Sequence, residues 1–183
     1  MIRQLEEKDF GRFFSYLDQH LAENGNGGTP LFHPAPRNTS GYPADKRAGF
    51  VQGLALPVGN PKWRRAWLAL NIDGHIVGHL DLRARPEPCT EHRALLGMGV
   101  RKDKQRLGLG RKLLEFGFDW ARQSELIEII DLNVMADNLP AIQLYQKAGF
   151  TRVCQVADMF RIDGRSEADI MMTKKLYESF QIL

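Results

Sequence analysis

The chain has 183 residues, of which 43% are hydrophobic and 26% are charged, and its formal net charge is +3. This fits one globular domain over residues 1–183, long enough to bury roughly 70% of its unfolded surface. No run of about 18 apolar residues is present, and the first residues lack a hydrophobic signal segment, so we expect a cytoplasmic protein without membrane contact. Cys89 and Cys154 fit no metal or redox spacing, which favours two reduced thiols and no metal.

The first third of the chain predicts a strand, a helix and a long irregular segment. Residues 2–5 form the strand, and apolar residues at helical spacing place the helix over residues 6–23. Residues 24–61 hold seven glycines and six prolines, which predicts irregular chain with at most a short helix near residues 45–56. A segment of this length is either a functional loop, here one that helps wall a binding cleft, or a surface insertion.

The middle of the chain predicts three strands. Residues 63–72 and 76–84 are joined by Asp73-Gly74, which is a hairpin signal. Alternate residues of the second strand are polar and would line one face of the sheet: His79, Asp81 and Arg83. Residues 85–91 interrupt this pattern, and residues 92–101 form the third strand, which leads into a turn rich in glycine.

After that turn, helix and strand alternate. An apolar stripe predicts a helix over residues 109–120, followed by a strand over residues 128–134. A second helix begins near Asn138, with a proline in its first turn, and ends at Gly149. Residues 150–156 and 168–174 are the last strands. This order predicts an α/β fold with a mixed sheet of six or seven strands.

The glycine turn is the strongest functional signal. Six basic side chains and one acid lie between Arg101 and Lys112, and two glycines leave the backbone uncovered where a helix begins. Bare N–H groups at a helix N-terminus bind phosphate oxygens. The basic residues gather at this turn instead of forming a long stripe, which favours a small anionic ligand over nucleic acid. A Walker A loop is excluded because no Gly-Lys-Ser/Thr follows, and the dinucleotide fingerprint lacks its third glycine.

Two motifs carry a resemblance to a known family. Gln105-Arg106-Leu107-Gly108-Leu109-Gly110 resembles the Gln/Arg-x-x-Gly-x-Gly/Ala signature of the GNAT superfamily of N-acetyltransferases, which binds the pyrophosphate of acetyl-coenzyme A. The segment from Asn138 to Phe150 is similar to the Asn-x-x-Ala-x-x-x-Tyr-x-x-x-Gly-Phe pattern that the family carries next. The resemblance covers about residues 68–175, is closest to a bacterial branch, and does not extend to residues 24–61.

The resemblance implies the GNAT acyl-CoA N-acyltransferase fold, a central and mostly antiparallel sheet of six or seven strands flanked by helices. It also implies acetyl-CoA as cosubstrate, without a metal. The residues that it assigns to the cofactor are Met98 and Val100 for the pantetheine amides, Gln105, Arg106, Leu107, Gly108, Leu109, Gly110 and Arg111 for the pyrophosphate, and Asn138 and Tyr145 near the thioester.

The catalytic residues are partly implied and partly open. By the resemblance, Tyr145 would protonate the departing thiolate, and the N–H of Met98 would bind the oxyanion. Many family members place a glutamate on the strand before the turn, but residues 94–100 contain no carboxylate. The candidate bases are therefore His79 and His92, with Asp81 and Glu91 as further candidates acting through water.

We therefore expect an N-acetyltransferase that transfers acetyl directly from acetyl-CoA to a primary amine of a small molecule or a protein. A non-catalytic acyl-CoA sensor is the first alternative, consistent with the missing carboxylate. A nucleotide-binding regulator is the second, supported only by the basic turn. No nucleic-acid or membrane partner is expected, and a monomer and a homodimer both remain open.

Overall fold

The computed structural model describes residues 1–39 and 41–177. The elements follow in this order: β1 (Ile2–Gln4), the short 3-10 helix η1 (Glu7–Asp9), α1 (Phe10–Ala22), α2 (Ala44–Ala55), β2 (Arg64–Leu70), β3 (Ile76–Ala84), β4 (Arg93–Val100), the short 3-10 helix η2 (Lys102–Lys104), α3 (Leu109–Gln123), β5 (Ile129–Met135), α4 (Leu139–Lys147), β6 (Thr151–Ile162) and β7 (Arg165–Lys175). None of the helices in the described part of the chain is long and apolar enough to cross a membrane.

The strands form one seven-stranded sheet in the order β1-β2-β3-β4-β5-β7-β6. Neighbouring strands are antiparallel except for β4 and β5, which run parallel. The mixed and mostly antiparallel sheet predicted from the sequence is confirmed. The parallel pair arises because α3 carries the chain from the end of β4 back to the start of β5.

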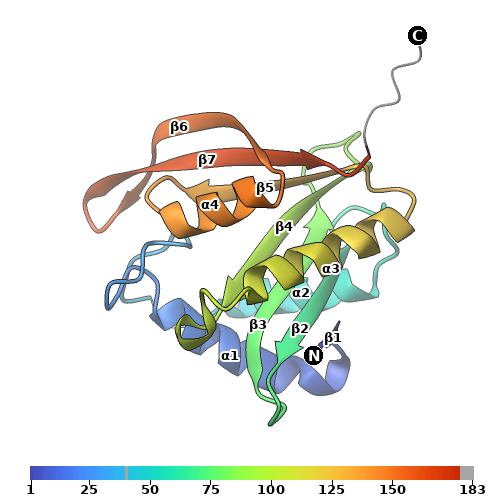
Figure 1. Ribbon diagram of the computed structural model, residues 1–183, viewed down its shortest axis with the longest axis horizontal. Coiled ribbons are helices and arrows are strands. Elements are labelled where there is room, and N and C mark those ends of the chain that lie inside the picture. The colour runs from blue at the N-terminus through green and yellow to red at the C-terminus, as the bar shows by residue number, and fades with distance from the viewer. Residues whose placement is uncertain (40, 178–183) are drawn as a thin grey trace.

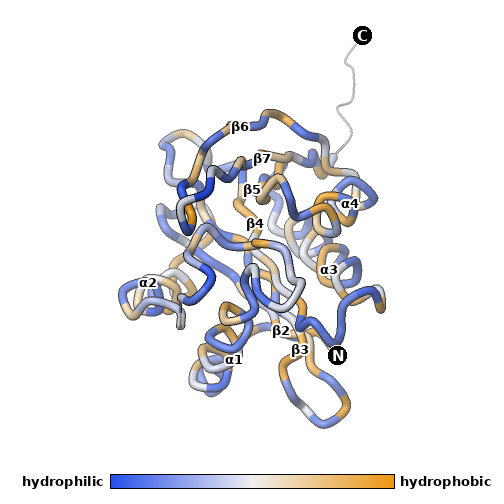
Figure 2. The backbone as a smooth tube through the Cα atoms, turned by 90° about the vertical axis from the view of Figure 1, so that its left-hand side faces the viewer, coloured by the Kyte–Doolittle hydropathy of each residue, from blue (hydrophilic) through white to orange (hydrophobic). Residues whose placement is uncertain are grey.

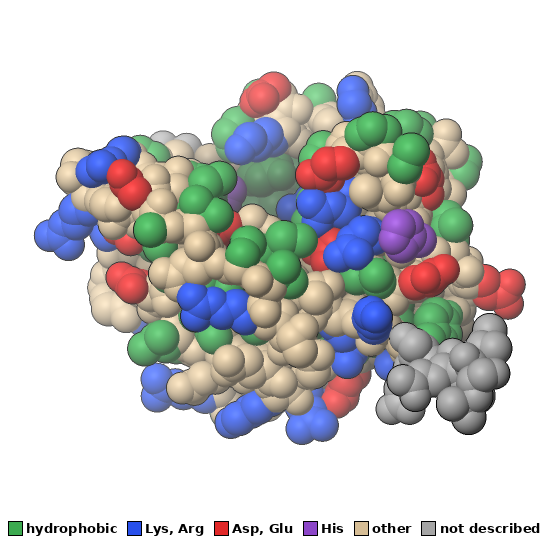
Figure 3. Space-filling model, turned by 90° about the horizontal axis from the view of Figure 1, so that it is seen from above, with side chains coloured by type: hydrophobic (Ala, Val, Ile, Leu, Met, Phe, Trp, Pro, Cys, Tyr) green, Lys and Arg blue, Asp and Glu red, His purple; other side chains and the backbone are tan. Residues whose placement is uncertain are grey.

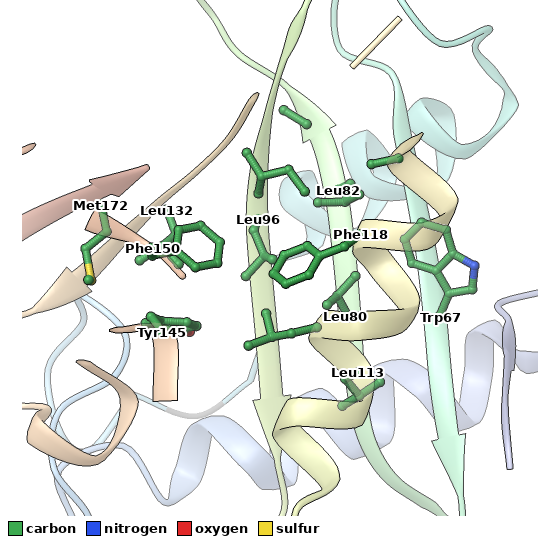
Figure 4. Close-up of a cluster of buried hydrophobic side chains, with 14 of the residues drawn as sticks. Trp67, Leu80, Leu82, Leu96, Leu113, Phe118, Leu132, Tyr145, Phe150 and Met172 are labelled. Carbon is green, nitrogen blue, oxygen red and sulfur yellow. The ribbon is translucent and has the colours of Figure 1, made fainter. Parts of the chain in front are cut away.

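Helices cover both faces of the sheet. Figures 1 and 2 show α1 and α2 on one face and α3 and α4 on the other. Alternation along β2 explains this, because Trp67 packs in the α3 cluster while Ala66 and Leu68 pack against α1. Figure 4 shows the larger cluster, in which Leu80 and Phe118 lie between β3, β4 and α3. Burial of each such side chain stabilises the fold by about 1.5–3 kcal/mol.

The two strands of the parallel pair separate after a short contact. Residue pairs join β4 and β5 only from Arg93 with Ile129 to Leu95 with Asp131. Beyond Leu95 the strands diverge, as Figure 1 shows, although β4 continues to Val100. The second half of β4 therefore has β3 on one side and an unpaired edge on the other.

The helix expected near residues 45–56 is confirmed, and one strand differs from its expected boundaries. The segment rich in glycine and proline contains α2, a regular helix of 12 residues whose Phe50 is buried against α1 and β2. The strand expected over residues 150–156 extends to Ile162, because the β6–β7 pairing resumes at Phe160 after an irregularity in register. Asp158, within that irregularity, has a φ of 53°. Such bulges break the alternation on which a sequence-based prediction of strands depends.

Candidate active site

The unpaired edge of β4 presents backbone groups to the gap beside β5. Arg101 N–H donates to Val77 O on β3, at 3.0 Å. Backbone groups of successive strand residues point to opposite sides, so those of Met98 and Val100 point away from β3 into the gap. Val100 O accepts a hydrogen bond from Gln105 Nε2 at 3.0 Å. The described residues supply no backbone partner on β5 for Met98 and Val100.

The glycine turn that follows exposes a row of backbone donors. Among residues 1–39 and 41–177, no acceptor bonds the N–H groups of Arg106 to Arg111, and the first helical bond of α3 is Lys112 N–H to Gly108 O at 3.1 Å. Gly108 caps the helix with a φ of 79°, a left-handed conformation that glycine adopts without strain. The open donors and the positive end of the α3 dipole together form an anion site.

Close packing fixes the position of this helix end. A Cβ atom on Gly110 would lie 2.9 Å from Leu144 Cδ2 on α4 and 3.5 Å from Met98 Cε. The glycine therefore lets α3, α4 and β4 meet at the gap. The side chains of Arg106 and Lys112 belong to no ion pair within the described chain, so their charges remain available to an anion.

Asn138 and Tyr145 place α4 beside the same gap. Asn138 Oδ1 accepts from Ala141 N at 3.3 Å and caps α4, which leaves its Nδ2 without a partner among the described residues. Tyr145 is buried beside Phe150, with ring centroids 5.7 Å apart, and burial raises its pKa to about 12. Its hydroxyl bonds to no group in the described chain. Figure 4 shows Tyr145 across from Leu96 of β4.

On the opposite face of the sheet, His79 belongs to a buried aromatic group. Tyr16 Oη donates to Gly99 O at 3.3 Å and lies 3.2 Å from His79 Nδ1. A hydroxyl has one hydrogen, so His79 Nδ1–H donates to Tyr16 Oη, and Nε2 keeps a free lone pair. Burial lowers the pKa of His79 to about 4. His79 is thus neutral and lies opposite Gly99, beside the second half of β4.

His20 completes this group from α1. Its ring stacks on Tyr16 and on Phe32, and a Cβ atom on Gly99 would lie 2.5 Å from His20 Nε2. Burial lowers the pKa of His20 to about 3, and its Nδ1 is buried without a hydrogen-bond partner in the described residues. The sequence did not single out His20, because a histidine on an apolar helix face gives no signal of its own.

The structure does not bring His92 to this place. His92 precedes β4, and its carbonyl accepts from Glu128 N and Ile129 N at the paired end of the β4–β5 ladder. Five residues of β4, Arg93 to Gly97, separate it from Met98, a distance of roughly 20 Å. The other assigned residues, by contrast, surround the second half of β4 and the start of α3.

An open depression lies between the loop after α1 and the β6–β7 turn, and Asp137, next to Asn138, is among its lining residues. Its volume is about 430 Å³, and it is lined by Gly25, Thr29, Pro30, Leu31, Arg37, Asp137, Arg165, Ser166 and Glu167. Figure 3, which views the molecule from above, also shows a hollow in the surface with hydrophobic side chains inside it and Lys or Arg side chains beside it. Residues from the loop over 24–37 therefore form one wall of this depression, on the sheet face that α1 covers.

Residues 31–150 match the protein family described as the Acetyltransferase (GNAT) family. This chain belongs to the GNAT family of acetyltransferases. An L-amino acid N-acetyltransferase of Escherichia coli, AaaT, is 35% identical over 83 residues, a match that spans 43% of this chain and 49% of that relative. An uncharacterized N-acetyltransferase of Bacillus subtilis, YycN, is 25% identical over 177 residues, which cover 96% of this chain and 98% of the relative.

The same fold occurs in a solved structure that includes acetyl-CoA. The putative acetyltransferase yncA from Salmonella typhimurium, described with its cofactor acetyl-CoA, superposes with a TM-score of 0.77 at 20% identity and covers 98% of this chain and 95% of that one. The GNAT family uses acetyl-CoA. The chain fits such a ligand, because the open N–H groups suit a pyrophosphate and the unpaired edge of β4 suits an amide-bearing arm.

Asp169 is a further polar residue, on the sheet face opposite α3 and α4, that the sequence did not single out. It lies on β7, accepts from Asn133 Nδ2 at 2.6 Å, and is 7% exposed. Burial raises its pKa above the ordinary value for an aspartate. The alternation of apolar and polar residues along β5 and β7 indicates that Asn133 and Asp169 point away from the apolar face of the sheet. The sequence does not indicate that these two side chains form a hydrogen bond.

Proposed function

We propose that this GNAT protein is an acetyl-CoA-dependent N-acetyltransferase that transfers acetyl directly to a primary amine. The observation that carries the proposal is the continuity of the unpaired β4 edge with the open N–H groups of Arg106 to Arg111. Relatives named as N-acetyltransferases support it, among them the E. coli protein and an N-alpha-acetyltransferase of Sulfurisphaera tokodaii that is 26% identical over 132 residues.

The residues divide into cofactor and acceptor groups. Arg106 to Arg111 hold the pyrophosphate, Met98 and Val100 bind the arm through backbone groups, and the Asn138 amide binds near the thioester. When bound, acetyl-CoA supplies the acetyl group as a thioester. In the transfer, a bond forms between the amine nitrogen and the acetyl carbon while the carbon–sulfur bond breaks, the amine loses one proton, and the thiolate gains one.

The chain provides one group beside the departing sulfur and one beside the amine, and water supplies the proton that the thiolate gains. Tyr145, with a pKa of about 12, stays protonated and donates a hydrogen bond to the departing sulfur. His79, with a free Nε2 and a pKa of about 4, accepts a proton only transiently and passes it to water. Because His79 is so weak a base, the concentration of neutral amine is set by the pH of the solution. An alkylammonium group has a pKa of about 10.4, so little neutral amine is present near neutral pH.

A non-catalytic sensor of acyl-CoA is the second candidate, favoured by one observation. The acceptor-facing positions of β4 are Gly97 and Gly99, so the strand carries no carboxylate that could act as a base. A sensor would bind acetyl-CoA and release no free thiol with any amine.

Calorimetry with acetyl-CoA and a thiol-release assay over a panel of amines test the proposal together. We expect binding, and turnover with at least one class of amine. Binding without turnover on any amine favours the sensor, and absence of binding refutes both. Gly110→Glu should abolish binding, since it places a carboxylate at the anion site and a side chain against Leu144. Gln123→Glu, which adds the same charge at the exposed end of α3, is the control.

A further inference from the structure

A charged pair lies on the floor of the acceptor face. Asp81 on β3 is the register partner of Gly97 on β4. A Cβ atom on Gly97 would lie 2.6 Å from Asp81 Oδ1 and 2.9 Å from Arg83 Nη1. The two charged groups therefore occupy the space that a side chain on β4 would fill, one residue from Met98.

Both members of the pair keep unused hydrogen-bonding capacity. Arg83 Nη1 donates to Asp81 Oδ2 at 3.0 Å, the one bond that joins them. A guanidinium has five donors, and this bond uses one of them. Asp81 Oδ1 has no hydrogen-bond partner within residues 1–39 and 41–177. The Arg83 side chain is 34% exposed, so its unused donors are accessible to a ligand, whereas the Asp81 side chain is 8% exposed and lies beneath them.

Positive charge exceeds negative charge around this pair. Arg64 Nε lies 3.5 Å from Asp81 Oδ2, and its guanidinium stacks over the Phe50 ring at 4.2 Å. Lys46 on α2 and Arg83 are both close enough to His33 to help lower its pKa, after the effect of burial. Two cations, Arg64 and Arg83, thus share the Asp81 carboxylate, and the surplus positive charge attracts an anion to a site that also offers a free carboxylate oxygen.

The free groups match a ligand that carries both charges. An ammonium group can donate to Asp81 Oδ1, while an anion a few ångströms away can take the unused donors of Arg83 in a bidentate bond. Lysine side chains and simple alkylamines provide only the first of these groups. The amino group of a free α-amino acid lies next to a carboxylate and provides both.

We propose that the acceptor is a zwitterionic amine of the α-amino acid class, bound by Asp81 through its ammonium group and by Arg83 through its carboxylate above Gly97. The ammonium group loses one proton to water before the neutral amine attacks the thioester. This inference rests on the proposed acetyltransferase function and deepens it. Asp81 and Arg83 act here as binding residues, which hold the amine beside the unpaired part of β4. The absence of a side chain at Gly97 is what leaves room for the Asp81 and Arg83 side chains above β4.

Matched acceptors test the proposal. An L-amino acid, its carboxamide and its decarboxylated amine differ only in the carboxylate, so thiol release is measured for several such sets at saturating acetyl-CoA. Values of kcat/KM are measured across pH for each form, which separates differences in amine pKa from differences in binding. We expect kcat/KM for the amino acid to exceed the other two by at least tenfold. Equal values for the three forms overturn the proposal.

Two variants assign the preference to the pair. Arg83→Gln should lower kcat/KM for the amino acid by at least tenfold and leave the affinity for acetyl-CoA unchanged. Gly97→Ala should do the same without removing a charge, because its methyl group displaces both side chains. Arg152→Gln, on exposed β6, and Gly11→Ala, which has no atom within 4 Å of the added methyl group, are the matched controls.

The outcomes separate this proposal from the function on which it rests. If wild-type protein turns over amines without a preference for the carboxylate, or if neither variant changes the preference, the acceptor proposal fails and the acetyltransferase function stands. If wild-type protein binds no acetyl-CoA, or turns over no amine in any set, the proposed function itself fails. Thermal melts of each variant show whether a loss of activity reflects unfolding.

Discussion

Removal of the Tyr145 hydroxyl isolates its chemistry from its packing. The side chain is 8% exposed, and its ring packs against Phe150, contacts that phenylalanine keeps. The hydroxyl bonds to no group in the described residues, so Tyr145→Phe should change the free energy of unfolding by less than about 0.5 kcal/mol. Loss of one positioned donor to a developing anion should lower kcat about 100-fold, which corresponds to about 2.7 kcal/mol in the barrier.

The pH profile decides how the hydroxyl acts. Burial raises the Tyr145 pKa to about 12. A thiol has a pKa near 8.5, so full proton transfer from Tyr145 to the thiolate is uphill by about 3.5 pH units, and the hydroxyl acts mainly as a hydrogen-bond donor. Since it remains protonated, kcat should show no falling limb from Tyr145 up to about pH 11. Equal turnover of the two proteins, or a falling limb near pH 9 that the variant lacks, would refute this reasoning.

Three further predictions concern stability and the cofactor. Asp131→Ala should lower the free energy of unfolding by about 3–5 kcal/mol in urea titrations, because it leaves Arg93, which donates to Asp131 at 2.7 and 2.8 Å, without its buried partner. Asn138→Ala should lower the free energy of unfolding by about 1 kcal/mol, because the N-cap of α4 is lost, whereas Asn138→Ser keeps this cap. A raised KM for acetyl-CoA in both variants would show that the Asn138 amide binds the cofactor. The pKa of His79 is lower in the folded than in the unfolded protein, so wild-type stability should fall as pH drops from about 6.5 toward 4, by up to about 1.4 kcal/mol per pH unit, and His79→Gln should lessen this slope.

Local patterns were sufficient for most of the fold. The alternation of β2 and the apolar stripe of α3 depend on neighbours in sequence, and both elements form as expected. The long β6 was shortened in the prediction because its pairing with β7 passes through a bulge, which only the partner strand can reveal. The helix expected near residues 45–56 forms as α2, and burial of Phe50 against α1 and β2 stabilises it.

The same distinction applies to the site: residues that are neighbours in sequence could be predicted, and residues brought together from distant elements could not. The turn from Gln105 to Gly110 is contiguous, so its motif could be read directly, and the structure adds that Gln105 itself bonds Val100 O. The groups around His79 come from separate elements: Tyr16 and His20 from α1, and the backbone of Gly99 from β4. No spacing in the sequence announces that these residues meet, because tertiary packing alone brings them together.

The glycines of β4 explain why that strand carries no carboxylate on the face that α1 covers. Side chains from neighbouring elements occupy the space above Gly97 and Gly99: Asp81 and Arg83 over the first, His20 and His79 over the second. The polar groups that face the acceptor have thus been supplied by β3 and α1, while β4 contributes only backbone. If this exchange is functional, a carboxylate returned to β4 by Gly97→Glu should not improve catalysis, since it would displace Asp81 and Arg83 from the position that they already fill. Turnover higher than wild type in that variant would show that β4 lacks a base that its neighbours do not replace.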